Sequence, residues 1–536
     1  KDAGYEVILG SGQVIFVPSY LTSVTGEAVY VNSALLDKIS KDDPVWYGSN
    51  ADASRSSSGS FPIALGGLLA GLGLAASGAE SNSNDRIDDI IRWTGDSVDG
   101  GGGEDTLQIN IQEVRDEAID LNNIVNFEKI TVTGISVSLK TADNLVSDGK
   151  KIIIDASGMN SGSNLTFDGS KETNGDFLII GSDGNDTIMG GQTSFSDEIY
   201  GGNGDDSISG GDGADTIVGG AGDDILDGGL GADSITSGSG NDSISGGADN
   251  DTLVFGVNLT SSDTVDGGSG TGDILTFTDG NSASDDLNRV TNVETITLGN
   301  ADTTVTSVDA LVASGATLTV DGSGLSGTKK LTWDGSAETN GRFNITGGAG
   351  ADTITGGSGA DTITGGAGAD AISSGNNNDV LQYSSGSELS IDTQVDGGSG
   401  TDTLLFTIAG VTDVDDSDFA KVINVEAIVF GNGNNVATFG TNAVSALTPG
   451  TGGVAISFGS GNDYLSLLSF TRASQVQLND GNDTIIGGAG ADSITSGSGN
   501  DSISGGASND TLVFGVNLTS SDTVDGGSGT GDILTF

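Results

Sequence analysis

The sequence predicts an all-β protein built as a parallel β-solenoid. A nine-residue unit, G-G-x-G-x-D-x-U-x with U an isoleucine or leucine, recurs eight times across residues 181–254, and one copy (190–200) carries two extra residues. A strand with one inward aliphatic side chain per unit cannot bury itself, so successive units must stack. The chain is 35% hydrophobic and 5% aromatic, which is too little for large conventional cores. Narrow ladders of isoleucine, leucine and valine suit this composition better.

The first 97 residues precede the repetitive body. Residues 1–50 contain short apolar runs such as YEVILG and QVIFVP, which predict a small β-rich N-terminal unit. The chain begins with Lys1, so we expect a segment upstream of it, including any signal peptide. Residues 51–97 are expected to form a linker.

The linker contains an apolar Gly/Ala/Leu-rich segment, residues 61–79, without a charge. As a helix it would be about 28 Å long, barely enough to cross a bilayer. Small residues at every fourth place, Gly67, Gly71, Ala75 and Ala79, favour close helix packing. Its glycines equally allow a buried or flexible apolar plug, and membrane contact through it stays an open alternative.

The repetitive body divides into modules that begin with a VDGG sequence. We expect module 1 at 98–264 with a roll of repeats at 181–254, module 2 at 265–394 with a roll at 347–382, module 3 at 395–523 with a roll at 478–513, and the start of a further module at 524–536. Residues 231–277 and 490–536 differ only at Asp249 and Ser508. Because the earlier copy continues past this point, we expect the natural polypeptide to extend beyond Phe536.

The stretches between rolls also contain strand-like pieces. In module 2 these pieces begin at 295, 317, 331, 343 and 352, at shrinking intervals. The shrinking intervals predict successive coils of one solenoid that tightens into the roll. The alternative is a separate β-sandwich between rolls.

An aspartate holds the sixth place of the repeat and points to a metal. Tight glycine turns direct backbone carbonyls into the bend, and stacking the turns aligns carboxylates that repel one another. Ca²⁺ accepts six to eight such oxygens. A flexible Gly/Asp-rich linker is the alternative, but a linker has no reason to keep an aliphatic residue in phase. The candidate ligands for multiple Ca²⁺ are Asp105, Asp186, Asp197, Asp206, Asp215, Asp224, Asp233, Asp242, Asp251, Asp352, Asp361, Asp370, Asp379, Asp402, Asp463, Asp483, Asp492, Asp501 and Asp510.

Two repeat copies depart from this pattern. In both copies of GGSGTGDIL a glycine, Gly272 or Gly531, occupies the aspartate place. This weakens the case for calcium at those turns.

The nonapeptide run resembles the RTX β-roll of secreted bacterial proteins. The resemblance implies that Ca²⁺ lies between successive turns, held by the aspartate carboxylates and the turn carbonyls. The stretches before each roll look like those of RTX S-layer and adhesin proteins. The order of the first 79 residues, a small β unit and then an apolar run, is similar to the N-terminal region of type I-secreted adhesins. Export by a type I system is what this resemblance implies.

Charge and composition exclude several functions. With 18 Lys+Arg against 75 Asp+Glu, the net charge is −57, which argues against nucleic acid and for bound cations. There is no cysteine and no histidine, so disulfides, HExxH zinc sites and Ser-His-Asp triads are excluded. We therefore expect no enzyme, no catalytic residues and no organic cofactor.

The leading hypothesis is an extracellular, calcium-dependent structural protein at a bacterial cell surface. It would form a surface layer, a fibre or an adhesin stalk, with copies of itself as partners and a possible attachment to the cell surface. The alternative is a spacer within a large type I-secreted adhesin whose ligand-binding domain lies outside this segment. An RTX-tailed hydrolase is disfavoured, because residues 1–97 are too few for a catalytic domain and lack histidine. Self-assembly through the N-terminal unit and residues 61–79 is a further hypothesis.

Overall fold

The computed structural model divides into two compact units, residues 1–242 and 243–536. It describes residues 98–536 apart from 101, 103, 113–117, 142, 144, 148, 193, 257–258, 279–285, 450–451 and 516–517, and before residue 98 only the backbone of six short strands. The apolar segment 61–79 lies outside the described residues. In the described part of the chain, no helix is long and apolar enough to span a bilayer.

The first 50 residues contribute antiparallel strands, as expected of a β-rich stretch. One sheet has the order β2-β1-β5, and β3 pairs with β4. The bounds are β1 (Gly4–Leu9), β2 (Val14–Pro18), β3 (Thr22–Thr25), β4 (Ala28–Val31) and β5 (Val45–Gly48).

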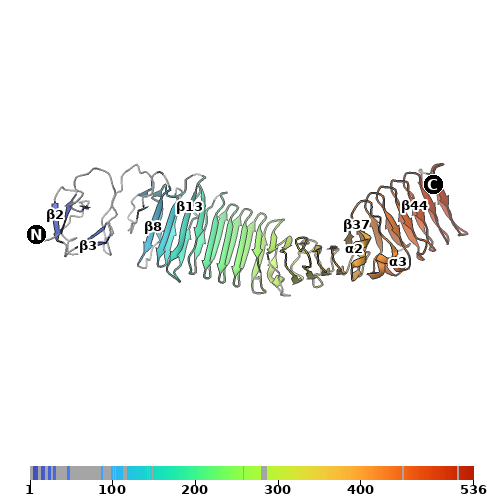
Figure 1. The fold of residues 1–536 in the computed structure, drawn as a ribbon, viewed down its shortest axis with the longest axis horizontal. Helices are drawn as coiled ribbons and strands as arrows, with labels where there is room; N and C mark the ends of the chain where they lie inside the picture. Colours follow the sequence, from blue (N-terminus) through green and yellow to red (C-terminus); the bar gives the residue numbers. More distant parts are fainter. Residues whose placement is uncertain are drawn as a thin grey trace. The chain divides into compact units, whose positions relative to one another are not determined.

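The body of the first unit is a parallel β-solenoid. The chain crosses one sheet and then the opposite one in each coil, and neighbouring strands of a sheet pair in parallel (Figure 1). One sheet contains β6 (Arg86–Ile87), β8 (Thr106–Ile111), β11 (Lys129–Gly134), β13 (Lys151–Met159), β15 (Asp176–Ile180), β17 (Glu198–Asn203), β19 (Thr216–Ala221) and β21 (Ser234–Ser239). The opposite side contains β7 (Val98–Asp99), β9 (Ile119–Asp120), β10 (Ile124–Val125), β12 (Val137–Lys140), β14 (Leu165–Asp168), β16 (Thr187–Met189), β18 (Ser207–Asp212) and β20 (Ile225–Leu230).

The second unit has the same architecture. Its long sheet contains β23 (Thr252–Phe255), β25 (Ile274–Phe277), β27 (Thr295–Leu298), β29 (Thr317–Asp321), β31 (Arg342–Gly348), β33 (Thr362–Gly366), β35 (Val380–Tyr383), β37 (Thr403–Phe406), β39 (Ala427–Phe430), β41 (Val454–Ser457), β43 (Ser474–Gln477), β45 (Ser493–Thr495), β47 (Thr511–Val513) and β49 (Ile533–Thr535). We call this the long sheet below.

The opposite side of the second unit is divided into shorter sheets. They contain β22 (Ser243–Ala248), β24 (Thr264–Gly268) and β26 (Val290–Thr291); β28 (Thr303–Thr306), β30 (Leu331–Asp334), β32 (Thr353–Thr355), β34 (Ala371–Ser373), β36 (Gln394–Asp396) and β38 (Val422–Ile423); and β40 (Val436–Thr438), β42 (Tyr464–Ser466), β44 (Thr484–Ile486), β46 (Ser502–Ser504) and β48 (Thr523–Asp525).

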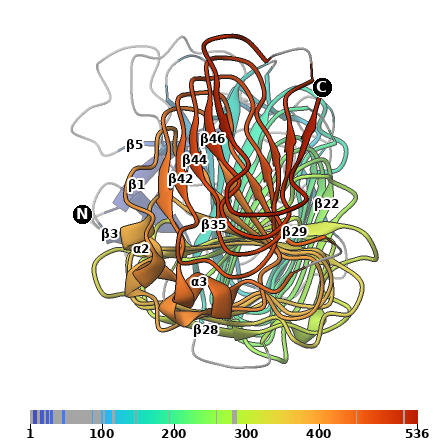
Figure 2. The same ribbon diagram turned by 90° about the vertical axis from the view of Figure 1, so that its right-hand side faces the viewer.

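Short helices interrupt the coils of the second unit, at η2 (Asp286–Arg289), α2 (Gly386–Ile391), η3 (Asp416–Lys421) and α3 (Thr441–Ala446). Helix η3 contacts both α2 and α3, so these three helices stack on successive coils (Figure 2). Their sequences have no repeat phase, and they were not predicted.

The linking stretches between rolls are coils of the same solenoid, which excludes the β-sandwich alternative. Thr295 of β27 pairs with Thr319, and Asn344 of β31 pairs with Thr362. The register therefore shortens to the 18 residues of two nonapeptides as the roll begins. One expectation was wrong: the pieces at 331 and 352 lie in the opposite sheet. The interval from 295 to 317 is therefore one whole coil, whereas the three later intervals are parts of coils.

The core is a single file of aliphatic side chains in each sheet. Ile199, Ile217 and Ile235 are at most 1% exposed and lie in register across β17, β19 and β21. This confirms the eighth repeat position as the core position. Wider linking coils fill the added space with rings: Phe430 stacks between Phe406 and Phe458, with centroid distances of 5.1 and 4.6 Å.

Glycine is required at the turn because neighbouring coils are in contact there. Gly220 has a φ of +123°, and a Cβ at this position would lie 1.9 Å from the carbonyl oxygen of Gly202. No other residue combines this backbone conformation with this proximity.

The narrow core makes one substitution diagnostic. We expect Ile217→Asp to destabilise the first roll by about 3–5 kcal/mol, because it buries an uncompensated charge in a core one residue wide. Hydrogen exchange of residues 199–235 measures the effect. The matched control is Thr216→Asp, which adds the same charge at the exposed neighbouring position. Equal loss of protection in both variants would contradict the assigned core.

Candidate metal centre

The repeat aspartate is buried and links one coil to the next. Asp215 is 1% exposed, and its Oδ1 accepts a hydrogen bond from the backbone N–H of Asp197 at 2.7 Å. The N–H of Asp215 in turn donates to Oδ1 of Asp233 at 2.7 Å. The tight turn cannot satisfy this N–H internally, so the carboxylate of the following coil does so.

These links form two columns in the first unit, one at each edge of the solenoid. Since a coil contains two nonapeptides, alternate aspartates fall on alternate edges. One column runs through Asp186, Asp206, Asp224 and Asp242, and the other through Asp197, Asp215 and Asp233, with N–H to Oδ1 distances of 2.7–2.9 Å.

The second unit repeats the arrangement. Its columns are Asp251–Asp273, Asp352–Asp370–Asp392, Asp361–Asp379–Asp402, Asp463–Asp483–Asp501–Asp522 and Asp492–Asp510–Asp532.

The second carboxylate oxygen, Oδ2, is the unsatisfied atom of the site. In the first coil of a roll it accepts a backbone N–H, as from Gly191 to Asp197 and from Gly357 to Asp361, both at 2.7 Å. Elsewhere, including Asp483 in the first coil of the third roll, it is buried without a hydrogen-bond partner; the residues are Asp206, Asp215, Asp224, Asp273, Asp370, Asp379, Asp402, Asp463, Asp483 and Asp510. A buried carboxylate oxygen in this state requires a proton or a cation.

The glycines place backbone carbonyls beside these oxygens. A Cβ built on Gly219 would lie 2.4 Å from Oδ2 of Asp224 and 2.5 Å from the carbonyl oxygen of Ser237. The missing side chain therefore leaves a space bordered by a carboxylate oxygen and a carbonyl oxygen. Hard oxygen donors of this kind fit Ca²⁺. Among the residues that the structure describes, no three Asp or Glu side chains gather around one point, so the donor set combines single carboxylates with carbonyls.

Burial shifts the acidity of the columns. Loss of hydration, followed by repulsion from neighbouring aspartates, raises the pKa of Asp206 and Asp215 to about 7 against partial compensation by the backbone N–H. The same causes raise the pKa of Asp370, Asp379 and Asp483 to about 7. Without a cation, these five aspartates would be partly protonated at neutral pH.

All nineteen aspartates predicted as ligands are buried, at 7% exposure or less. The structure places them in the columns, with Asp105 donating its N–H to Oε2 of Glu128 at 2.7 Å. The structure brings them together as successive members of a column and not as clusters.

In the two GGSGTGDIL copies, the residue after the glycine continues the hydrogen-bonded column. The extra residue is accommodated in the turn, and the next residue takes the aspartate place: Oδ1 of Asp273 accepts the N–H of Asp251 at 2.8 Å, and Oδ1 of Asp532 accepts that of Asp510 at 3.1 Å. Asp273 is fully buried. The column therefore continues where Gly272 and Gly531 had suggested a break.

Other members of the columns were missed. Glu128, Glu294 and Glu426 accept the N–H groups of Asp105, Asp273 and Asp402 at 2.7–2.9 Å, and Asp392 and Asp522 continue two further columns. A signal was present in the sequence. Each of these acidic residues except Asp392 stands two places before a core aliphatic residue, as the repeat aspartate does.

The fold and its turns define a parallel β-roll with carboxylate columns along its edges. The family model described as the RTX calcium-binding nonapeptide repeat matches residues 178–192, 193–226, 227–257, 346–381 and 478–512. The matched segments contain RTX calcium-binding nonapeptide repeats and coincide with the three rolls. A search of curated proteins finds no match.

The raised pKa values predict how the calcium-free protein responds to pH. Because the folded-state pKa of about 7 for Asp206 and Asp215 exceeds the ordinary 3.8, folding takes up protons. Stability is therefore full below pH 3.8 and is lost as pH rises through 7. We expect the β signal of circular dichroism in calcium-free buffer to be smaller at pH 8 than at pH 5.

General repulsion in an acidic chain has the same sign, so a matched pair of variants is needed. Asp206→Asn with Asp215→Asn should reduce the pH dependence. Asp205→Asn with Asp223→Asn removes the same two charges at exposed positions and should leave it nearly unchanged. An identical pH dependence in the two variants would show that the columns are not its source.

Proposed function

We propose that this chain is an extracellular, calcium-dependent structural protein that forms a surface layer, a fibre or an adhesin stalk at a bacterial cell surface. The observation that carries the proposal is the run of buried carboxylates in both units whose Oδ2 atoms have no hydrogen-bond partner. Once deprotonated, such columns need a counter-charge. Each unit would be rigid in calcium and unstable without it.

The chain's own cations do not supply this counter-charge. In the described part of the chain the ion pairs are Lys129–Asp155, Lys140–Asp120 and Lys151–Glu198, and none involves a repeat aspartate. With 18 Lys+Arg in the whole sequence against 75 Asp+Glu, lysine and arginine cannot neutralise the columns. An external cation is needed.

The residues that would hold Ca²⁺ are the column aspartates, through Oδ2, together with the carbonyls of the glycine turns. The bound ions supply positive charge between coils that otherwise repel. Asp206, Asp215 and Asp224 would bind in the first roll, and Asp370, Asp379 and Asp483 are corresponding positions in the later rolls. Several ions per chain follow from the repetition.

Calcium coupling would also suit export. At low intracellular calcium the unpaired columns would keep the chain unfolded, and outside the cell binding and folding would be one event. This supports secretion by a type I system. A spacer within a larger adhesin is the second candidate function, since coils that continue one another are suited to setting distance. No catalytic role is proposed.

Removal of calcium tests the proposal directly. We expect a chelator to abolish most of the β signal in circular dichroism and added Ca²⁺ to restore it, because binding and folding share one free energy. Addition of Mg²⁺ at the same concentration is the control, because Mg²⁺ dehydrates reluctantly and fits all-protein sites poorly. An unchanged spectrum in chelator would rule out calcium-coupled folding.

Substitution within one roll tests whether the column aspartates stabilise that roll in calcium. We expect Asp215→Ala with Asp224→Ala to loosen the first roll, because one member of each column is lost. Hydrogen exchange at saturating calcium should show lower protection in residues 199–235 and unchanged protection in residues 345–381, since each coil contacts only its neighbours.

The matched control is Asp205→Ala with Asp223→Ala, which removes two exposed carboxylates from the same turns. Its protection should stay close to that of the unsubstituted chain. Equal effects of the two double variants would assign the calcium dependence to overall charge and not to the columns.

A further inference from the structure

The outward face of the long sheet carries no charged side chain from β33 to β49. Two side chains of each strand point outward in alternation with the core residues. They are Thr362, Thr364, Val380, Gln382, Thr403, Leu405, Ala427, Val429, Ala455, Ser457, Gln475, Gln477, Ser493, Thr495, Thr511, Val513, Ile533 and Thr535. We call this surface the neutral face.

A neutral face of this length is unexpected in this chain. Charged residues make up 17% of the sequence, and an ordinary surface carries about 25–35% of them. Strand pairing keeps the neutral side chains in register, from Thr403–Ala427 through Ala455–Gln475 to Ser493–Thr511. The acidic side chains are instead concentrated in the turns.

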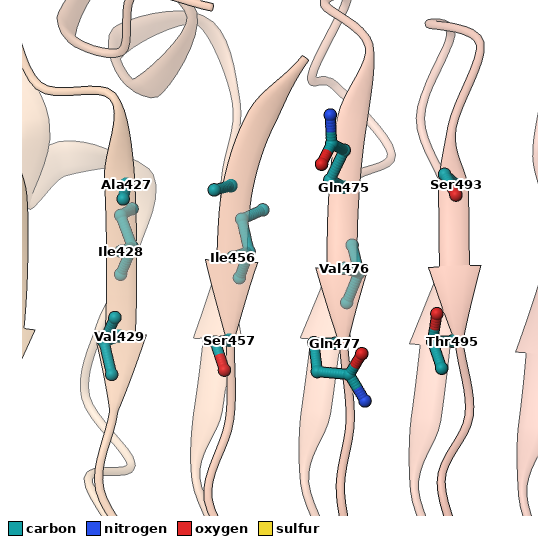
Figure 3. A pocket seen from close by; sticks show the side chains of 11 residues that line it. Ala427, Ile428, Val429, Ile456, Ser457, Gln475, Val476, Gln477, Ser493 and Thr495 are labelled. Atoms are coloured by element: carbon teal, nitrogen blue, oxygen red, sulfur yellow. The ribbon is translucent and has the colours of Figure 1, made fainter. Parts of the chain in front are cut away.

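The neutral face is also not flat. A shallow depression of about 250 Å³ lies over β39, β41, β43 and β45. Figure 3 shows Gln475 and Gln477 on one strand with the shorter Ser457, Ser493 and Thr495 on the strands beside it. Gln475 and Gln477 are the longest side chains that border this depression.

We propose that the neutral face is the surface through which two copies of this chain associate. Two molecules with a net charge of −57 repel wherever acidic surfaces meet, and like charges brought together cost several kcal/mol. The neutral face removes that cost. A two-fold arrangement brings the same neutral patch of both copies together, so that no acidic surface faces another across the contact.

The chemistry of the face favours a second copy over a carbohydrate. Stacking on sugar rings needs exposed aromatic side chains, but Tyr383, Phe406 and Phe430 in these strands point inward and are buried.

The area of the neutral face limits how strongly two copies associate. Nine strands at about 4.8 Å spacing span about 40 Å and bury on the order of 400 Å² per copy, half of the roughly 800 Å² of a stable complex. The association is therefore weak alone and accumulates in an array.

This inference rests on the proposed structural function and names its partner. Introducing negative charge at Gln475 and Gln477 tests this proposal. Gln475→Glu with Gln477→Glu changes no side-chain size and places four carboxylates in one two-fold contact. Sedimentation velocity of the 536-residue chain in saturating calcium should show concentration-dependent association for the unsubstituted chain, with the variant needing about tenfold higher concentration.

The matched control is Ser502→Glu with Thr523→Glu, which adds two charges at exposed positions of β46 and β48 on the opposite side. It should associate like the unsubstituted chain. Circular dichroism of each sample, with and without chelator, reports calcium-dependent folding separately from association. A monomeric unsubstituted chain, equal association of both variants, or binding of a neutral polysaccharide or of ice without self-association would each overturn the proposal.

Discussion

The hydrogen bond from the backbone N–H of one turn aspartate to the carboxylate of the next coil is the interaction on which this structure depends. It satisfies a donor that the glycine turn leaves unpaired, and it sets the register between coils. A neutral asparagine could make the same bond. The carboxylate differs because its second oxygen remains buried, and under the proposed function this oxygen would couple the fold to a cation. On this proposal, one aspartate side chain both accepts a backbone N–H and makes the fold depend on calcium.

The thin core explains why this coupling matters. Each coil of a roll contributes one aliphatic side chain to each sheet, such as Ile217 and Leu226, so hydrophobic burial per coil is small. Stability is then close to a sum over neighbouring coils. A repulsive term repeated at every coil cannot be offset by a large core elsewhere. The cation must act locally, at the turns where the repulsion arises.

Much of the fold and the candidate site could be predicted from the nonapeptide, because the regular spacing of its residues determines both the core position and the carboxylate position. An aspartate at place six and an isoleucine at place eight are two residues apart, so a buried carboxylate and a buried core residue follow from the same register. The prediction failed where the phase breaks. Asp273 was overlooked because one inserted residue moves it away from place six, although it precedes its strand as the other aspartates do. The helices α2, η3 and α3 have no repeat to reveal them. The neutral face was hidden because Ser457 or Gln475 is unremarkable alone, and only strand pairing aligns them.

The linking coils show that the same backbone hydrogen bond also forms where the carboxylate is not fully buried. Glu128, Glu294 and Glu426 accept the same backbone N–H as the repeat aspartates, but these glutamates are only half-buried. Water therefore screens their charge, and the coil needs less counter-charge. The extra methylene lets the carboxylate reach its donor across a wider coil, whose interior is filled by rings such as Phe430 and not by a single aliphatic file. One hydrogen-bond geometry thus continues through coils that differ in width and in their demand for a cation, which is how rolls and linking stretches form one solenoid within each unit.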